Sequence, residues 1–235
     1  MRLLTWNVWK NSPPYETRVR IIAAEIAAAD PDIVLLQEAF VGGGADTARD
    51  LGRALGLVAT AAPARLKRRP HGGAMVDSTN GLAILSRRPV DFNRVVALPA
   101  HPDDPDRIAQ IVRVGALVVV NVHLTHLAGA DALRRGQIVH LLDRLPEDKP
   151  TVVAGDLNAE PEGWAPRTLR EAGFHDLAEA APFPTCGGRR IDFLLCRGLP
   201  VQGATVRAVG DRPINGIDGS DYVGVLAELP DPDPR

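Results

Sequence analysis

The stretch Val152-Val153-Ala154-Gly155-Asp156-Leu157-Asn158 runs from an apolar segment straight into a carboxylate and a carboxamide. The apolar segment predicts a buried strand that ends near the glycine. Residues two apart in an extended segment face the same way, so Asp156 and Asn158 are expected to point into one space. Such a pair can orient a water molecule while another oxygen binds a hard cation. The same pattern also marks ordinary turns after strands, so by itself it leaves the function open.

Polar side chains stand at the ends of apolar runs at several other places in the chain. Burying many such groups is costly unless they serve a common purpose. Strand ends that gather at one edge of a layered fold make a natural binding site. Taken singly, each residue also fits a solvated strand end, a structural histidine or a turn acid. The residues in this pattern are Asn7, Glu38, His123, Asp156, Asn158, Asp192 and Asp221.

The chemistry of these residues favours metal and phosphate binding. Glu38 follows an apolar run, and a carboxylate there suits Mg²⁺, which prefers oxygen ligands and few protein contacts. Asn7 offers a neutral amide that can bridge a metal-bound oxygen and the backbone. His123 shares one strand face with Asn121 and offers a donor for a phosphate oxygen. Asp192 begins an apolar run, where a carboxylate needs a partner.

The composition is that of an ordinary globular chain without a strong charge bias. The 235 residues are 45% apolar and 24% charged, which suits one domain over residues 1–230 with a frayed tail at 231–235. The net charge of −2 lacks the basic surplus of a dedicated duplex-binding protein, so duplex DNA is not the expected partner. Basic clusters, among them residues 65–69, are interpreted mostly as solvated surface or loop charges.

Cysteine usage and hydropathy indicate a reducing, aqueous compartment. Cys186 and Cys196 show no zinc-type spacing and are expected to be reduced structural thiols. No signal peptide precedes the first predicted strand, and no apolar run approaches the ~20 residues of a membrane span. We therefore expect a cytoplasmic monomer without a membrane segment.

The spacing of apolar residues predicts strands alternating with helices. Residues 16–29, for example, carry apolar side chains at spacings of three and four, which is typical of a helix. Residues 63–80 are rich in Pro, Gly and Arg and are predicted to form a long loop. Strands are predicted at 3–8, 33–36, 82–86, 92–98, 108–114, 117–124, 151–154, 191–196, 204–208 and 222–229, and helices at 16–29, 46–55, 130–145 and 166–172.

Seven short motifs follow one another along the chain. They are Trp-Asn at 6–7, Leu-Gln-Glu at 36–38, Gly-Leu-Ala-Ile-Leu-Ser at 81–86, Asn-Val-His-Leu at 121–124, Gly-Asp-Leu-Asn at 155–158, Arg-Ile-Asp-Phe-Leu-Leu at 190–195 and Ser-Asp at 220–221. In this order they resemble the endonuclease/exonuclease/phosphatase superfamily. The resemblance covers nearly the whole chain, about residues 3–229. It implies a four-layered α/β/β/α sandwich, a Mg²⁺ or Mn²⁺ site, and substrate selection by loops at 41–46, 63–80, 99–107 and 182–190.

The resemblance also implies a role for each candidate residue. Glu38 would be the principal metal ligand, with Asn7 and Asp221 close to it. The pair at 156 and 158 would position or activate the attacking water. His123 would contact the phosphate, and Asp192 would orient a catalytic histidine.

That histidine is replaced in this chain. The family pattern is Ser-Asp-His, whereas the sequence reads Ser220-Asp221-Tyr222. A phenol with an ordinary pKa of ~10 stays neutral near pH 7 and supplies no positive charge to the transition state. Losing one such stabiliser costs about 10²–10³ in rate. In the other interpretation, Tyr222 only packs at the start of the last strand, and His123 or His126 takes over the role.

The leading interpretation is a divalent-metal-dependent phosphoric ester hydrolase acting on a small-molecule, nucleotide or single-stranded nucleic-acid substrate. Two alternatives stay open. One is a catalytically weak pseudoenzyme that binds metal or phosphate, and the other is a biosynthetic enzyme that uses the metal on a non-phosphate ligand. Tyr222 favours both alternatives. Retained metal chemistry is favoured by Glu38, Asp156, Asn158 and Asp192.

Overall fold

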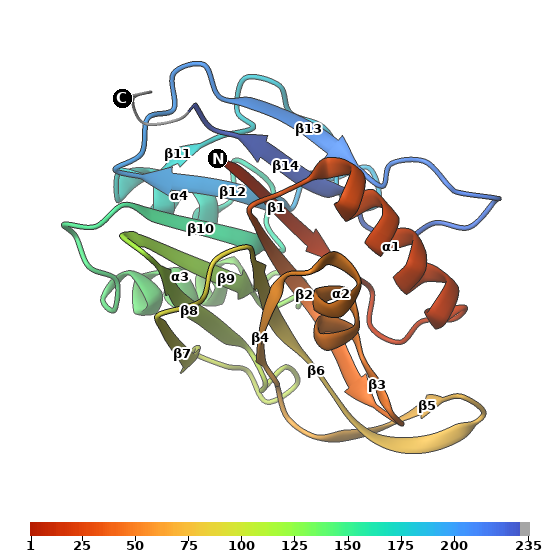
Figure 1. Cartoon of the computed structure of the whole chain (residues 1–235). Helices are drawn as coiled ribbons and strands as arrows, with labels where there is room; N and C mark the ends of the chain where they lie inside the picture. The colour runs from red at the N-terminus through yellow and green to blue at the C-terminus, as the bar shows by residue number, and fades with distance from the viewer. Residues whose placement is uncertain (231–235) are drawn as a thin grey trace.

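Two β-sheets packed face to face form the centre of the molecule, and helices cover the outer face of each sheet (Figure 1). The computed structural model describes residues 1–230. Its layers are those of the α/β/β/α sandwich predicted from the sequence. The tail predicted at 231–235 lies outside the described residues. Within residues 1–230, no helix is both long and apolar enough to cross a membrane.

The first sheet is built around β1 (Arg2–Asn7), which pairs in parallel with β2 (Ile33–Gly42) and antiparallel with β14 (Gly224–Glu228). Both faces of β1 are buried, which explains its almost uninterrupted apolar sequence. The other strands of this sheet are β3 (Ala45–Asp46), β4 (Val58–Ala62), β5 (Lys67–His71), β6 (Ala74–Ser86) and β13 (Thr205–Val209).

The second sheet is built around a parallel pair, β9 (Leu117–His123) and β10 (Thr151–Asp156). The valine run of β9 is buried on both faces, since Val119 faces the first sheet and Val120 faces the helices. The other strands of this sheet are β7 (Phe92–Ala97), β8 (Ile108–Val114), β11 (His175–Asp176) and β12 (Asp192–Arg197).

Apolar stripes on the helices complete the two outer layers. On one side, Ile22, Ile26 and Leu51 pack against the first sheet. On the other side, Ile138 and Leu169 pack against the second sheet. The helices of the first side are α1 (Tyr15–Ala29) and α2 (Thr47–Leu55), and those of the second are α3 (Asp131–Leu142) and α4 (Trp164–Glu171).

The prediction of a long loop at residues 63–80 is wrong for most of that segment. Strands β5 and β6 form a hairpin there, which reaches away from the body of the sandwich (Figure 1). His71 pairs with Ala74, so the turn consists of Gly72 and Gly73 alone. Both glycines have positive φ, 59° and 81°, as a two-residue turn of this kind requires. The Gly72-Gly73 pair therefore predicts a hairpin turn, although the composition of the segment is typical of a loop.

Two predicted strand limits near the site are also wrong. The strand expected at 33–36 continues to Gly42, so Glu38 does not stand at its end. Instead the pairing of β2 with β6 shifts between Gln37 and Ala39, and Glu38 occupies the resulting bulge with φ 59°. A bulge re-aims a side chain without ending the strand. The last strand begins at Gly224, and Tyr222 lies before it, in an isolated bridge with Cys186.

Candidate active site

Strand register brings the candidate residues to one edge of the sandwich. In the second sheet, Asp156 ends β10 and is paired with His123 on one side and Asp192 on the other. In the first sheet, Asn7 ends β1 beside Gln37, one residue before the Glu38 bulge. The chain enters β14 at the same edge, because β14 runs antiparallel to β1.

Asp156 is the centre of this group and is fully buried. Its Oδ1 accepts a hydrogen bond from the backbone N of Asn158 at 2.8 Å, and its Oδ2 accepts one from Nδ2 of Asn7 at 3.3 Å. Burial raises the pKa of this carboxyl to about 6 despite these bonds. Nε2 of His123 lies 3.4 Å from Oδ2. Asp156 is therefore tightly oriented and changes its charge near neutral pH.

Asn158 reaches the site differently from the expectation of a shared extended face. It lies beyond the end of β10 with φ 48°, so residues 156 to 158 form a turn. Its side-chain Nδ2 donates to the backbone O of Leu124 at 3.0 Å. Asn158 thus anchors the end of β10 to the end of β9, and its backbone rather than its side chain holds Asp156.

Asp192 is buried, and neither of its carboxylate oxygens accepts a hydrogen bond from the residues described. Burial and the nearby charge of Asp156 raise the pKa of Asp192 well above its usual value. Like charges this close favour a proton on at least one of the two acids. Asp192 therefore lacks a cationic partner within residues 1–230, and the neighbouring Thr185 hydroxyl is the group that favours its ionised form.

Tyr222 takes a different partner from the one expected at its position. Its hydroxyl interacts with Asp156 and with the Cys186 thiol. The charge of Asp192 also acts on it, but the Asp192 carboxylate accepts no hydrogen bond from it. Its backbone O accepts a bond from Nε1 of Trp6 at 2.9 Å, which ties this segment to β1. Burial and then the charge of Asp156 raise the pKa of the phenol well above its ordinary value, so it stays protonated. Tyr222 is accordingly a neutral donor inside the site.

His123 lies at the end of β9 with a largely buried side chain. Burial, followed by the charges of Arg107 and Lys10, lowers its pKa well below the usual value. The imidazole is therefore neutral near pH 7, and its contact with Asp156 is not an ion pair. A neutral imidazole can still donate one hydrogen bond to a phosphate oxygen.

The donors available for a metal are carboxylate and amide oxygens. Glu38 is nearly buried in its bulge, and Asp221 lies on the exposed rim, near enough for the Glu38 charge to raise its pKa after burial does. The Asn7 Oδ1 accepts from the backbone N of Trp9 at 3.1 Å, so Asn7 is already partly engaged. Within residues 1–230, no three His, Cys, Asp or Glu side chains are grouped tightly enough to hold an ion alone.

This donor set fits Mg²⁺ or Mn²⁺ bound through few protein ligands and several waters. All of its atoms are hard oxygens, and the carboxyls around them repel one another. Nζ of Lys10 lies 3.4 Å from Oε2 of Glu38 and supplies the cation nearest to that carboxylate. Glu38 is the residue that could hold such an ion, with Asp221 and Asn7 beside it as further oxygen donors.

The Endonuclease/Exonuclease/phosphatase family matches residues 4–221 of this chain. The chain belongs to the Endonuclease/Exonuclease/phosphatase family. Members of this family are typically hydrolases of phosphate esters and generally use divalent metals. The match spans the candidate residues from Asn7 to Asp221, and Tyr222 lies directly after it.

Solved structures show the same fold. An endonuclease/exonuclease/phosphatase from Beutenbergia cavernae DSM 12333 is 25% identical, with a TM-score of 0.77 over 97% of this chain and 71% of its own. The human Nocturnin catalytic domain, solved with a bound sulfate anion, is 20% identical with a TM-score of 0.72 over 97% and 92%. Truncated Caenorhabditis elegans TDP2 is 20% identical with a TM-score of 0.67 over 96% and 95%. No curated protein matches the sequence significantly.

The sequence analysis missed Arg18, a residue that connects two loops of the candidate site. Arg18 of α1 is buried, and its five N–H groups donate to five backbone carbonyls. Four of these carbonyls lie in the loop after β1, at residues 8–12, and the fifth belongs to Gly219. Arg18 therefore joins the loop that carries Lys10 to the loop that carries Asp221. The signal was a cation on the apolar stripe of α1, one turn before Ile22.

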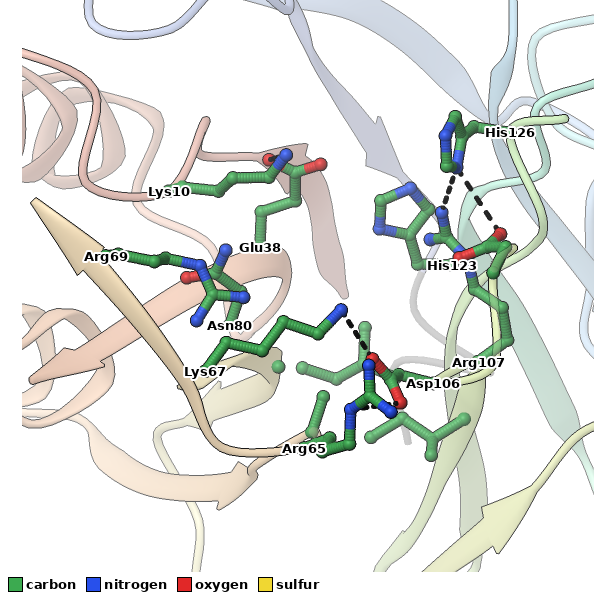
Figure 2. A pocket seen from close by; sticks show the side chains of 15 residues that line it. Lys10, Glu38, Arg65, Lys67, Arg69, Asn80, Asp106, Arg107, His123 and His126 are labelled. Carbon is green, nitrogen blue, oxygen red and sulfur yellow. Dashed lines mark hydrogen bonds and ion pairs between the residues drawn. The ribbon is translucent and has the colours of Figure 1, made fainter. Parts of the chain in front are cut away.

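A cavity of about 220 Å³ opens beside Glu38 and His123 (Figure 2). One wall comes from the β5–β6 hairpin and the other from residues 104–108. The basic run at 65–69, interpreted above as mostly solvated charge, contributes three side chains to this cavity. Arg65 and Lys67 keep exposed side chains, as that interpretation expects, whereas Arg69 is half-buried, so the interpretation is wrong for Arg69.

Proposed function

We propose that this chain is a divalent-metal-dependent phosphoesterase that hydrolyses a small phosphate ester. The observation that carries the proposal is the hydrogen-bonded group of Asp156, Asn7 and Asn158, with Nε2 of His123 3.4 Å from Asp156, at the same edge as Glu38. Family membership supports the reaction class. The metal, the substrate and the role of each residue belong to the proposal.

In this proposal each side chain has a defined task. A metal at Glu38 would neutralise phosphate charge and polarise the scissile group. Asp156, with a pKa of about 6, accepts the proton of the attacking water at neutral pH. Asn7 and the Asn158 backbone hold its carboxylate in one orientation. Neutral His123 donates a hydrogen bond to a phosphate oxygen.

Tyr222 favours a second candidate function, a metal- and phosphate-binding protein with weak turnover. The phenol is neutral and its hydroxyl interacts with Asp156, the group proposed as the base. Two consequences follow for the rate. No positive charge faces the transition state from this position, and the proposed base is partly engaged. We therefore expect slow hydrolysis of ordinary phosphodiesters, with metal binding retained.

The test is a hydrolysis panel of phosphomonoesters and phosphodiesters with Mg²⁺, with Mn²⁺ and with excess chelator. The proposal expects metal-dependent turnover of at least one ester and loss of about 10³ or more in Asp156→Asn, which removes the base and keeps the shape. Metal binding without turnover of any ester would favour the second candidate. Equal turnover by Asp156→Asn would contradict the assignment of the base.

A further inference from the structure

The cavity beside the proposed metal site has a basic ladder, which we define as Arg65, Lys67 and Arg69. These residues are two apart, and in extended backbone such residues face the same side. All three line the cavity, whereas Leu66 and Arg68 between them do not. Arg65 and Lys67 remain open to solvent there, with side chains 58% and 42% exposed, and Arg69 is half-buried. Alternate residues of one basic run are therefore placed along the cavity.

The ladder faces a second basic wall across the cavity. Arg107 and His126 lie opposite β5, and His123 stands between the two walls (Figure 2). Asp106 bonds Lys67 at 2.6 Å and Arg65 at 3.2 Å, and Arg107 pairs with Asp104 at 2.7 Å. Together with Lys10, the cavity has five Lys and Arg side chains against three Asp and Glu. It keeps an excess of positive charge on a chain whose net charge is −2.

Arg69 is the cation of this cavity that is not neutralised by an ion pair within the described residues. Its Nη1 donates to the Ser78 backbone O at 2.9 Å and to Oγ at 3.1 Å, which fixes the guanidinium beside Asn80. Among residues 1–230, no carboxylate lies within salt-bridge distance of it, and its Nη2 donates to no group. A half-buried cation held in place with a free donor is a ready anion contact.

We propose that the ladder binds a second anionic group of the substrate, so that this site takes compact phosphate esters with two separate negative groups. The inference rests on the proposed function, because the scissile phosphate is placed at Glu38 and His123. Arg69 and Lys67 then contact the second group from one wall, and Arg107 contacts it from the other. A substrate with one phosphate leaves these cations unused.

The shape of the cavity favours a small molecule over a nucleic-acid strand. Its volume of about 220 Å³ lies below the roughly 300–1,000 Å³ of drug-sized ligand pockets, so the cavity suits a compact anionic group. No Phe, Tyr or Trp side chain from the described residues lines it, so it lacks the stacking platform that single strands use. Recognition here rests on charge and on hydrogen bonds from the ladder.

The experiment measures binding by calorimetry in an Asp156→Asn background with Mg²⁺, so that turnover does not interfere. The probes are fructose 1,6-bisphosphate against fructose 6-phosphate, and adenosine 3′,5′-bisphosphate against adenosine 5′-monophosphate. We expect at least one bisphosphate to bind tenfold or more tightly than its monophosphate. Arg69→Gln should abolish this preference, and Arg68→Gln on the opposite face should keep it. If Arg69→Gln lowers the melting temperature, Lys67→Gln serves as a second variant for the same comparison of affinities.

Three outcomes overturn the inference: no preference in either pair, a preference that survives both ladder variants, or tighter ladder-dependent binding of a single-stranded oligonucleotide. Wild-type hydrolysis of the same probes separates this inference from the proposed function. A ladder-dependent preference, without hydrolysis of these probes or of any ester in the panel above, keeps the inference and contradicts the proposed function. Hydrolysis of mono- and bisphosphates with equal kcat/KM keeps the proposed function and contradicts the inference.

Discussion

At the scale of the residue, the chemistry centres on the carboxyl of Asp156. Burial favours its neutral form, while hydrogen bonds from Asn158 and Asn7 favour its ionised form. The balance leaves a pKa of about 6, against 3.8 for an unperturbed aspartate. The group is thus largely ionised at pH 7 and is still basic enough to accept a proton.

This shift predicts a pH-dependent stability of the metal-free protein. A carboxyl whose pKa is raised by folding binds its proton more tightly in the folded state, so its unfavourable contribution appears as pH rises from about 4 to about 6. Relative to Asp156→Asn, the wild type should lose about 2 kcal/mol of unfolding free energy between pH 4.5 and 7, out of about 3 kcal/mol for the whole shift. Urea unfolding in chelator at pH 4.5, 5.5 and 7 measures this difference. A difference that is constant with pH, or that grows in favour of the wild type, contradicts the shift.

The replacement of histidine by Tyr222 gives the second prediction at this scale. In Tyr222→His, an imidazole would lie near both Asp156 and the unpartnered Asp192, and the two acids would favour its cationic form. We expect hydrolysis with Mg²⁺ to rise by about 10² or more. The measurement is kcat/KM on the ester that the wild type turns over best.

Tyr222→Phe is the matched control, because it removes the hydroxyl and adds no charge. If the wild type already turns over briskly and Tyr222→His gains nothing, the tyrosine is a competent replacement. If the wild type and Tyr222→His both fail to hydrolyse every phosphate ester, the site has a function other than phosphate-ester hydrolysis.

At the scale of the element, α1 holds two active-site loops through one side chain. Lysine has three donors and no planar fork, so Arg18→Lys leaves some of the five carbonyls unsatisfied, and the bonds to Val8 and Gly219 are buried. Each orphaned group costs about 1–3 kcal/mol, and we expect a loss of about 3 kcal/mol in unfolding free energy. Arg20→Lys, an exposed change on the same helix, should cost less than about 0.5 kcal/mol. Urea unfolding measures both, and equal costs would exclude the anchoring role.

The elements with regular apolar spacing were predictable, and those with unusual backbone were not. Helix α1 and strand β10 follow directly from their periodicity, with limits close to those observed. The β5–β6 hairpin was missed because Pro, Gly and Arg dominate its sequence, although Gly72-Gly73 encodes its turn. Composition averages over a segment, whereas a turn depends on two positions.

The candidate site was likewise predictable only in part. Which residues gather at the edge could be predicted, because strand ends in a layered fold meet there. The bulge at Glu38 could not, since it arises from a register shift between β2 and β6 rather than from local preference. The role of Arg18 and the placement of the ladder along the cavity could not be predicted either, because both depend on which side of an element faces the site.

At the scale of the whole molecule, the site is divided between the two sheets. The first contributes Asn7 and Glu38, and the second contributes His123, Asp156 and Asp192. A buried polar bridge fixes the sheets against each other directly behind it. Nε2 of Gln37 donates to Oδ1 of Asn121 at 2.7 Å, and the Asn121 amide donates to backbone O atoms of β2 and β6 at 2.9 and 3.0 Å. Metal and substrate bound at this edge would therefore contact both halves of the sandwich.

The central claim is that a divalent metal binds at Glu38, and calorimetric titration with Mn²⁺ near pH 7 tests it most directly. We expect the wild type to bind Mn²⁺ and Glu38→Gln to bind it at least tenfold more weakly, on the order of 1.4 kcal/mol. Glu179→Gln changes an exposed side chain that makes no hydrogen bond to the residues described, and it should bind like the wild type. Unchanged affinity in Glu38→Gln, or no Mn²⁺ binding by the wild type, would contradict the account.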